Sequence, residues 1–215
     1  MSPLRFIVYF DYLCPWCYNG SVRLRALELE YAGRVELEWR SYLLRPEHKV
    51  YSDREKSLEK FRTYTRHWIK VQEDGEGDGG DFQVWASDEG PASSSLPAHC
   101  VSKAAEAIGA DAFAAMHDRL LRAYFQESQD ISDIDVLRKL WSELGLPVSG
   151  FDLATRAETQ ERVVAEYREA LDQGATGVPA VQLAGNSAVI VGAHPLALYR
   201  RWIERSLSRR AKAAP

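Results

Sequence analysis

The chain has few cysteines and no long apolar run, with only three cysteines among its 215 residues. No segment approaches the roughly 18 apolar residues that span a bilayer, which argues against a membrane protein. Residues 1–10 also lack the charged region, the long apolar region and the cleavage site of a signal peptide. We therefore expect a cytoplasmic protein, in which closely spaced cysteines are catalytic or metal-binding rather than a permanent structural disulfide.

An excess of positive charge is also absent. Lysine and arginine number 27 against 31 for aspartate and glutamate, a formal net charge of -4, so no nucleic-acid partner is expected. Hydrophobic residues make up 46% of the chain and charged residues 27%, which is within the range of globular proteins. The chain is long enough to bury one substantial core, with or without an insertion.

A strand-helix-strand unit opens the chain. Leu4–Phe10 is a run of apolar, β-branched and aromatic residues that predicts a strand buried on both faces. Apolar residues among arginine and glutamate then predict a helix to about Tyr31, which Gly33 ends. Alternation over Val35–Tyr42 predicts a second strand. This βαβ unit places Cys14-Pro15-Trp16-Cys17 at its first turn.

The pattern becomes mostly helical after Pro46. The predicted helices cover Ser57–Val71, Pro97–Ile108, a segment from Asp111, a segment capped by Ser132 or Asp133 whose inner face includes Ile134, and Glu158–Leu171. Residues 73–95 form a loop, and its acidic start at 73–81 is expected to be a flexible surface segment. It resembles the start of a calcium loop, but the twelfth position is Trp85 instead of glutamate.

Short apolar runs return near the end of the chain. Pro179–Leu183 and Ala188–Val191 predict a β-hairpin, and Pro195–Leu207 predicts a closing helix. Without the helical block the order is β-α-β-β-β-α, a compact α/β layer with one helix on each side. We therefore expect one domain from residues 1–45 and 175–215, with residues 46–174 as an all-helical insertion.

The spacing of Cys14 and Cys17 suits thiol-disulfide exchange, which needs an attacking thiolate and a second thiol that releases the mixed disulfide. Cys14 precedes the helix, where free N–H groups and the helix dipole favour an anion, so it is expected to be the accessible attacking thiolate. Cys17 lies one turn inside and is expected to be the sheltered resolving thiol. Pro15 suits the first helical turn, and Trp16 would form an exposed apolar rim. Asp11 would tune the pair or relay a proton to Cys17, or it simply caps the loop.

Metal binding and an inert pair are the competing interpretations. A zinc site needs two more ligands, and the nearest candidates, His99 and Cys100, are adjacent in sequence and so point in different directions on a helix. We predict no metal site, and Cys100 is expected to be a small buried hydrophobe. The five histidines show no metal-ligand spacing, so surface or capping roles are expected for His48, His67, His99, His117 and His194.

A second candidate site is Gly177-Val178-Pro179, which comes just before the predicted hairpin. Proline is allowed at the start of a strand, and its peptide bond is cis in a minority of cases. Combined with a cysteine pair at the first βα turn, this segment is predicted to be a functional loop that faces the sulfurs.

Together these features resemble the DsbA-like thiol-disulfide oxidoreductases, and most closely their cytoplasmic FrnE-type branch. Three stretches carry the resemblance: residues 10–20 (FDYLCPWCYNG), residues 123–131 (AYFQESQDI), and Gly174–Ala180 with Val191–His194. The resemblance implies a thioredoxin fold with a helical insertion. It implies Cys14 as the nucleophile and Cys17 as the resolving thiol. It further implies that Pro179 is a cis-proline and that the backbone of Val178 pairs with an extended substrate.

Relatives of this architecture widen the choice of reaction. They include 2-hydroxychromene-2-carboxylate isomerases and kappa-class glutathione transferases, which typically carry serine where Cys14 stands. Both cysteines here favour redox chemistry on protein or peptide thiols, with no bound cofactor and with glutathione as a candidate redox partner. A glutathione-dependent isomerase or transferase remains an alternative, as does a non-enzymatic peptide-binding or holdase module. The sequence leaves open the direction of the reaction and whether the protein is a monomer or a homodimer.

Overall fold

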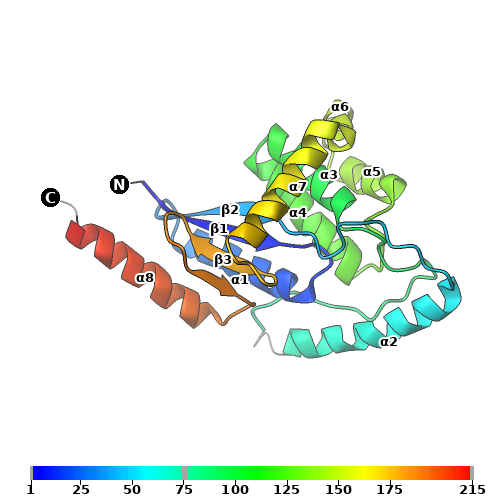
Figure 1. Cartoon of the computed structure of the whole chain (residues 1–215), viewed down its shortest axis with the longest axis horizontal. Helices are drawn as coiled ribbons and strands as arrows, with labels where there is room; N and C mark the ends of the chain where they lie inside the picture. Colours follow the sequence, from blue (N-terminus) through cyan, green and yellow to red (C-terminus); the bar gives the residue numbers. More distant parts are fainter. Residues whose placement is uncertain (1, 74–76, 214–215) are drawn as a thin grey trace.

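The computed structural model describes residues 2–73 and 77–213 of the chain (Figure 1). The elements run in the order β1 (Leu4–Phe10), α1 (Pro15–Glu30), β2 (Val35–Ser41), α2 (Arg54–Glu73), α3 (Leu96–Ile108), α4 (Ala110–Phe125), α5 (Ile134–Glu143), α6 (Val148–Phe151), the 3-10 helix η1 (Asp152–Thr155), α7 (Ala157–Asp172), β3 (Ala180–Leu183), β4 (Val189–Val191) and α8 (Leu196–Ala213). This is a thioredoxin fold whose βαβ and ββα halves are separated by helices, as the sequence predicts. No helix in the described part of the chain is both long and apolar enough to cross a membrane.

The four strands form one mixed sheet in the order β2-β1-β3-β4. Strand β1 pairs with β2 in parallel and with β3 in antiparallel orientation, so that Tyr9 lies opposite both Arg40 and Ala180. Because β3 runs against β1, the start of β3 lies at the same edge of the sheet as the end of β1. The topology therefore brings Val178-Pro179 to the turn that carries the cysteines.

The two faces of the sheet are covered differently from the expectation of one helix on each side. Phe6 of β1 meets side chains of both α1 and α8, Leu24 and Ile203 among them. On the other face, Ile7 and Tyr9 pack with Ala170 of α7. Figure 1 shows α7 and α8 on opposite sides of the sheet. The second layer is thus supplied by the helical insertion, because α1 and α8 occupy the same face.

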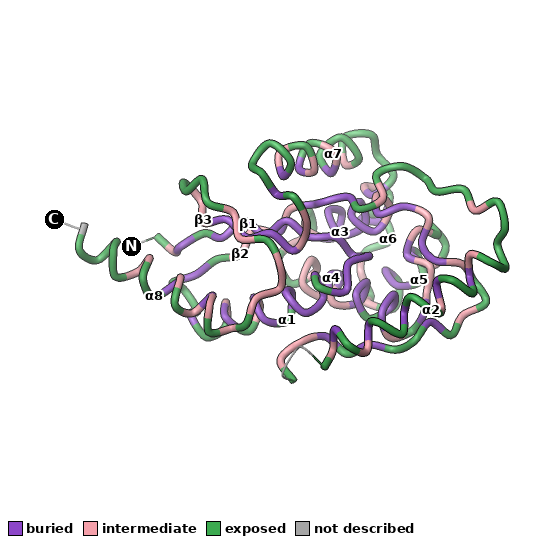
Figure 2. Tube along the Cα trace, turned by 60° about the horizontal axis from the view of Figure 1, so that its bottom comes forward, coloured by how far each residue is buried: buried purple, intermediate pink, exposed green. Residues whose placement is uncertain are grey.

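Residues 46–174 share a continuous core with the sheet, and the core is rich in aromatic rings. Figure 2 shows buried residues running through both the sheet and the helices between β2 and β3. Trp68 of α2 packs edge-on against Phe125 of α4 at 4.8 Å, and Trp85 of the long loop packs against Tyr124 at 5.3 Å. Trp85 is buried although it lies in a segment without helix or strand. The division of the chain into two domains stays a prediction.

The acidic segment 73–81 is not a free surface loop where the structure describes it; residues 74–76 of this prediction lie outside the described residues. The N–H of Gly80 donates to Asn19 Oδ1 at 2.7 Å. A Cβ at Gly80 would lie 2.4 Å from Cδ1 of Tyr18, so only glycine allows this close approach. The segment therefore docks on α1 at the two residues that directly follow Cys17.

Helix boundaries mostly agree with the prediction, with one error on α5. Asp133 caps α5 by accepting hydrogen bonds from the N–H groups of Asp135 and Val136. Ile134, which the sequence places on the inner face, is 40% exposed because it precedes the stripe that begins at Leu137. The short helix α6 is not predicted by the sequence. Helix α8 runs six residues beyond its predicted end, and there the Arg210 side chain donates to the Ser2 carbonyl at 2.8 Å.

Candidate active site

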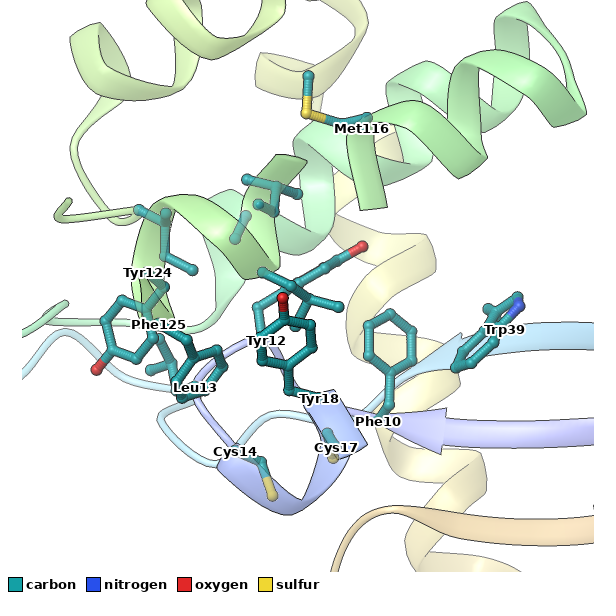
Figure 3. Close-up of a cluster of buried hydrophobic side chains, with 14 of the residues drawn as sticks. Phe10, Tyr12, Leu13, Cys14, Cys17, Tyr18, Trp39, Met116, Tyr124 and Phe125 are labelled. Atoms are coloured by element: carbon teal, nitrogen blue, oxygen red, sulfur yellow. The ribbon is translucent and has the colours of Figure 1, made fainter. Parts of the chain in front are cut away.

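Cys14 is the N-cap of α1, directly after the turn that follows β1 (Figure 3). Its carbonyl accepts hydrogen bonds from the N–H groups of Cys17 and Tyr18 at 3.0 and 3.3 Å, which start the helix. Pro15 occupies the first helical position, where its missing N–H leaves no partner unsatisfied. The local sequence thus fixes Cys14 at the positive end of the helix dipole.

The two sulfurs point into different surroundings. Cys14 Sγ lies 3.4 Å from the Val178 carbonyl oxygen, and Cys17 Sγ accepts a hydrogen bond from the N–H of Asp11 at 3.4 Å. Both cysteines are free thiols. The sequence predicts an accessible Cys14, but the residue is only 6% exposed, against 1% for Cys17. Trp16 beside them is 39% exposed.

The electrostatics of Cys17 favour its thiol form. Burial raises the pKa of the Cys17 thiol well above its ordinary value, and the hydrogen bond with Cys14 and the charge of Cys14 act in the same direction. The N–H of Asp11 lowers this pKa, whereas the Asp11 carboxylate raises it. Cys17 is therefore a protonated thiol held next to Cys14, which suits a resolving role better than an attacking one.

Asp11 is fully buried beneath the pair. Its Oδ1 accepts from the N–H of Leu13 at 2.6 Å, and its Oδ2 accepts from the N–H of Leu44 at 2.7 Å. Burial raises the pKa of Asp11 from 3.8 to about 6, although hydrogen bonds from Ser95 and the two backbone groups and the charge of Arg45 lower it. Both carboxylate oxygens are thus engaged in the loop, as a cap would be. Its charge nevertheless raises the pKa of Cys17, so a capping role does not exclude a tuning role for this side chain.

The Val178-Pro179 segment faces the cysteines across the first turns of α1. The peptide bond between Val178 and Pro179 is cis, and the Pro179 carbonyl accepts from the N–H of Gly192 at 2.7 Å. A Cβ at Gly20 would lie 2.9 Å from Cγ of Pro179. Gly20 therefore lets the proline ring sit directly on α1. Sequence reasoning did not assign it a role, although a glycine inside a helical pattern signals a packing constraint. Gly177, whose Cβ would meet only Val191 at 3.6 Å, lacks that constraint.

Arg23 is a second residue that sequence reasoning missed. Its side chain is 4% exposed and pairs with Asp78 at 2.7 Å. The same guanidinium donates to the carbonyls of Ala193 and His194 at 3.0 and 3.2 Å. Arg23 therefore links the loop at Asp78 and the loop at residues 193–194 to the helix that carries the cysteines. A buried arginine on an otherwise unremarkable helix gives no signal in the sequence alone.

Two histidines contradict the expectation of surface or capping roles. His99 and His117 are both buried, at 1% and 0% exposure. Desolvation by burial lowers the pKa of each imidazole from 6.5 to about 3, so both are neutral at physiological pH. His117 hydrogen-bonds Tyr12 and Ser21, which flank the cysteine pair.

The remaining cysteine lies away from this chemistry. Cys100 is buried on α3, and burial raises the pKa of its thiol to about 12. It packs in the core as a small hydrophobic residue, as the sequence predicts. Within residues 2–73 and 77–213, no three histidine, cysteine, aspartate or glutamate side chains are grouped so that they could hold a metal ion.

The βαβ and ββα halves around a cysteine pair at a helix N-terminus define the class as a thioredoxin-fold protein of the redox type. A family model for the DSBA-like thioredoxin domain matches residues 5–204. The chain therefore belongs to the DsbA-like family of thiol-disulfide oxidoreductases. The narrower FrnE-type branch stays a prediction.

Similar proteins are consistent with this assignment. YwbO of Bacillus subtilis (strain 168), which is uncharacterised, is 29% identical over 171 residues, covering 73% of this chain and 74% of YwbO. A crystal structure from Nitrosomonas europaea has a TM-score of 0.78 at 18% identity, covering 97% of this chain and 99% of that chain. The cytosolic disulfide reductase DsbM from Pseudomonas aeruginosa, solved with GSH, has a TM-score of 0.67 at 22% identity, covering 95% and 100%. At these identities the two structures show a shared fold.

Proposed function

We propose that this chain is a protein dithiol-disulfide oxidoreductase in which Cys14 and Cys17 are the redox pair. The observation that carries the proposal is the position of Cys14 Sγ, at the N-terminus of α1 and 3.4 Å from the carbonyl of Val178. Cys14 lies there at the positive end of the helix, and the main chain of Val178 lies beside it to align a second polypeptide.

The chemistry consists of two exchange steps. The Cys14 thiolate attacks one sulfur of a substrate disulfide, forms a mixed disulfide and releases the other substrate sulfur as a thiolate. Cys17 then loses its proton and attacks Cys14 Sγ, which releases the second substrate sulfur and leaves a Cys14–Cys17 disulfide. Two electrons pass from the protein to the substrate. One proton comes from Cys17 and the other from solvent, which took up the Cys14 proton when that thiol ionised, so both released substrate sulfurs end as thiols. The reverse sequence oxidises a substrate dithiol.

Three neighbouring residues support these steps in the proposal. Pro15 starts the helix and keeps Cys14 at its end. Trp16 supplies an apolar rim for a polypeptide. The raised pKa of Cys17 must fall for resolution; bonding Cys14 to substrate removes the charge and the hydrogen bond of Cys14 that help to raise it, whereas burial, the largest cause, remains. Asp11 tunes this second step, since its charge raises the pKa of Cys17 and its N–H lowers it.

The proposed substrates are protein or peptide disulfides, aligned against the main chain of Val178 within the Gly177-Val178-Pro179 loop. Glutathione is proposed as a redox partner, supported by the likeness to a DsbM structure solved with GSH. The same likeness to a cytosolic protein supports a cytoplasmic location. A bound cofactor is not part of the proposal.

Reduction of insulin by dithiothreitol tests the proposal. We expect the protein to accelerate the reaction and the Cys14→Ser variant to lose that acceleration. Cys100→Ser is the matched control, because it removes a buried thiol outside the site. Cys17→Ser should accumulate a mixed disulfide through Cys14, detectable as an added substrate mass that a reductant removes. Equal rates for wild type and Cys14→Ser would exclude the proposed role of Cys14.

The same variants separate the two alternatives. A glutathione-dependent isomerase or transferase would bind glutathione in calorimetry and keep this binding after Cys17→Ser. A holdase would suppress aggregation of an unfolded protein equally well when both cysteines are serine. No specific contact in the site favours the glutathione-dependent enzyme or the holdase, so these tests decide between each of them and the proposed function.

A further inference from the structure

A buried polar group in the helical insertion contacts both segments that flank the cysteine pair. His117 lies on α4, and its Nε2 is 2.6 Å from Ser21 Oγ while its Nδ1 is 3.2 Å from the Tyr12 hydroxyl. Tyr12 is two residues before Cys14, and Ser21 is one helical turn beyond Cys17. The imidazole therefore links the loop before the pair to the helix after it.

The hydrogen bonds define which nitrogen of His117 carries the proton. The Tyr12 hydroxyl donates its only proton to Ser102 Oγ at 2.7 Å, so it accepts from Nδ1–H of His117. Nε2 is then the acceptor, and the Ser21 hydroxyl donates to it. A neutral imidazole with one donor and one acceptor satisfies the whole chain of groups, which is the state that burial favours.

We propose that His117 is a positioning residue for the Cys14–Cys17 pair, and this inference rests on the proposed function of that pair. Disulfide formation requires the two sulfurs to reach about 2.05 Å with a restricted dihedral angle. The more firmly the segments on both sides of the pair are held, the higher the effective concentration of one thiol at the other. His117 holds one residue on each side, and it does so from α4, outside the βαβ unit.

A second contact between the same helices supports this arrangement. Asp118, next in sequence to His117, pairs with Arg25, one turn beyond Ser21 on α1. Both partners of this ion pair are partly exposed, whereas Ser21 and His117 are buried. A buried hydrogen bond generally contributes more than a surface ion pair, and Ser21 lies one turn nearer to the cysteines along α1 than Arg25 does. His117 is thus the contact from α4 that is expected to act on the pair.

A purely structural role makes a different prediction. His117 also packs against the ring of Trp39 at 4.7 Å, so its replacement lowers stability whatever its other roles. Loss of packing that destabilises the dithiol and disulfide forms equally leaves the equilibrium between them unchanged. Loss of positioning shifts that equilibrium toward the dithiol, because the disulfide is the form that requires the aligned geometry.

The test is the redox equilibrium of the protein against glutathione, measured for wild type and for two variants. His117→Phe keeps a ring and removes both hydrogen bonds, and Ser21→Ala removes one of them with less effect on folding. We expect the equilibrium constant for the protein disulfide to fall by about three- to tenfold in His117→Phe and by less in Ser21→Ala. His117→Gln, which can still bond Ser21, should recover part of the loss.

His99→Phe is the matched control. Like His117, His99 is a buried imidazole that packs on Phe10 and Tyr12, but it lies on α3; its ring centroid is 5.2 Å from that of Phe10 and 4.9 Å from that of Tyr12. We expect this variant to lose stability without a shift in the equilibrium. An unshifted equilibrium in both His117→Phe and Ser21→Ala, or an equal shift in His99→Phe, would overturn the positioning role.

A second measurement keeps this result separate from the proposed function. If wild type formed no reversible Cys14–Cys17 disulfide, the proposed function would fail. Amide hydrogen exchange over residues 12–21 of the reduced protein would then still test His117. Faster exchange in His117→Phe than in His99→Phe supports the positioning role, and equal exchange refutes it.

Discussion

Replacing the buried Asp11 by asparagine should change how stability depends on pH. Burial raises the pKa of this carboxyl from 3.8 to about 6, so the folded protein holds its proton more tightly than the unfolded chain does. Asp11 therefore contributes stability that is fully present below about pH 3.8 and is lost as the pH rises through about 6. At 1.36 kcal/mol per pKa unit, the full loss is about 3 kcal/mol.

The asparagine variant lacks this titration but also loses a hydrogen bond. One of the N–H groups of Leu13 and Leu44 would meet the amide NH₂ instead of an oxygen, at a cost of about 1–3 kcal/mol that does not depend on pH. The sign of the effect at one pH is therefore a balance of two terms. The change with pH comes from the Asp11 titration alone. Between about pH 4.5 and about pH 8, the free energy of unfolding of Asp11→Asn should rise by about 2 kcal/mol relative to that of wild type.

Urea unfolding of the reduced protein at the two pH values measures this difference. Titrating groups that Asp11 does not influence contribute equally to wild type and variant and cancel. Cys17, whose pKa the Asp11 charge helps to raise, is a thiol at both pH values because burial holds its pKa well above its ordinary value. A difference in the free energy of unfolding that is the same at both pH values would refute the assignment of a raised pKa to Asp11. Asp78→Asn, which alters a partly exposed carboxylate paired with Arg23, serves as a control for the loss of one negative charge.

Two further predictions concern buried neighbours of the site. Burial lowers the pKa of His99 and of His117 to about 3 in the folded protein. As the pH falls below about 6.5, each imidazole takes up a proton in the unfolded chain but not in the folded protein. Stability that is present at neutral pH is therefore lost. Urea unfolding should show His117→Gln losing about 2 kcal/mol less than wild type between about pH 7 and about pH 5; an equal loss would contradict this. Gly20→Ala should push Pro179 off α1, lowering stability by about 1–3 kcal/mol and insulin reduction by about tenfold, whereas Gly90→Ala, whose Cβ meets none of the described atoms within 4 Å, should match wild type. Unchanged turnover in Gly20→Ala would show that the proline's seat on the helix does not matter for the reaction.

Local signals in the sequence were sufficient for the first half of the site. The apolar run predicts β1 as Leu4–Phe10, the bounds that the structure has. Pro15 predicts the start of α1, and that start makes Cys14 the N-cap. These features depend on residues within one or two turns of each other, which is why composition and spacing reveal them.

Errors arose where the outcome depended on distant packing. Helical spacing places Ile134 on the inner face of its helix, but the buried residues of α5 begin at Leu137, and Ile134 is exposed. Isolated histidines carry no spacing signal, yet both buried imidazoles lie in the core: His99 packs among aromatic rings, and His117 hydrogen-bonds Ser21. Cys14 is more buried than its position at the turn before α1 implies, because Val178, 164 residues further along the chain, packs with its carbonyl oxygen 3.4 Å from the sulfur.

The sequence alone thus determined the kind of chemistry, since a cysteine pair at a helix N-terminus and a Val-Pro segment before a hairpin are local patterns. Only the tertiary structure decided what holds these parts in register: Gly20 against Pro179, Arg23 between two loops, and His117 between Tyr12 and Ser21. The physical reason is distance along the chain. A cap or an apolar run is specified by its neighbours, whereas a contact between residues far apart exists only after the sheet and helices have packed.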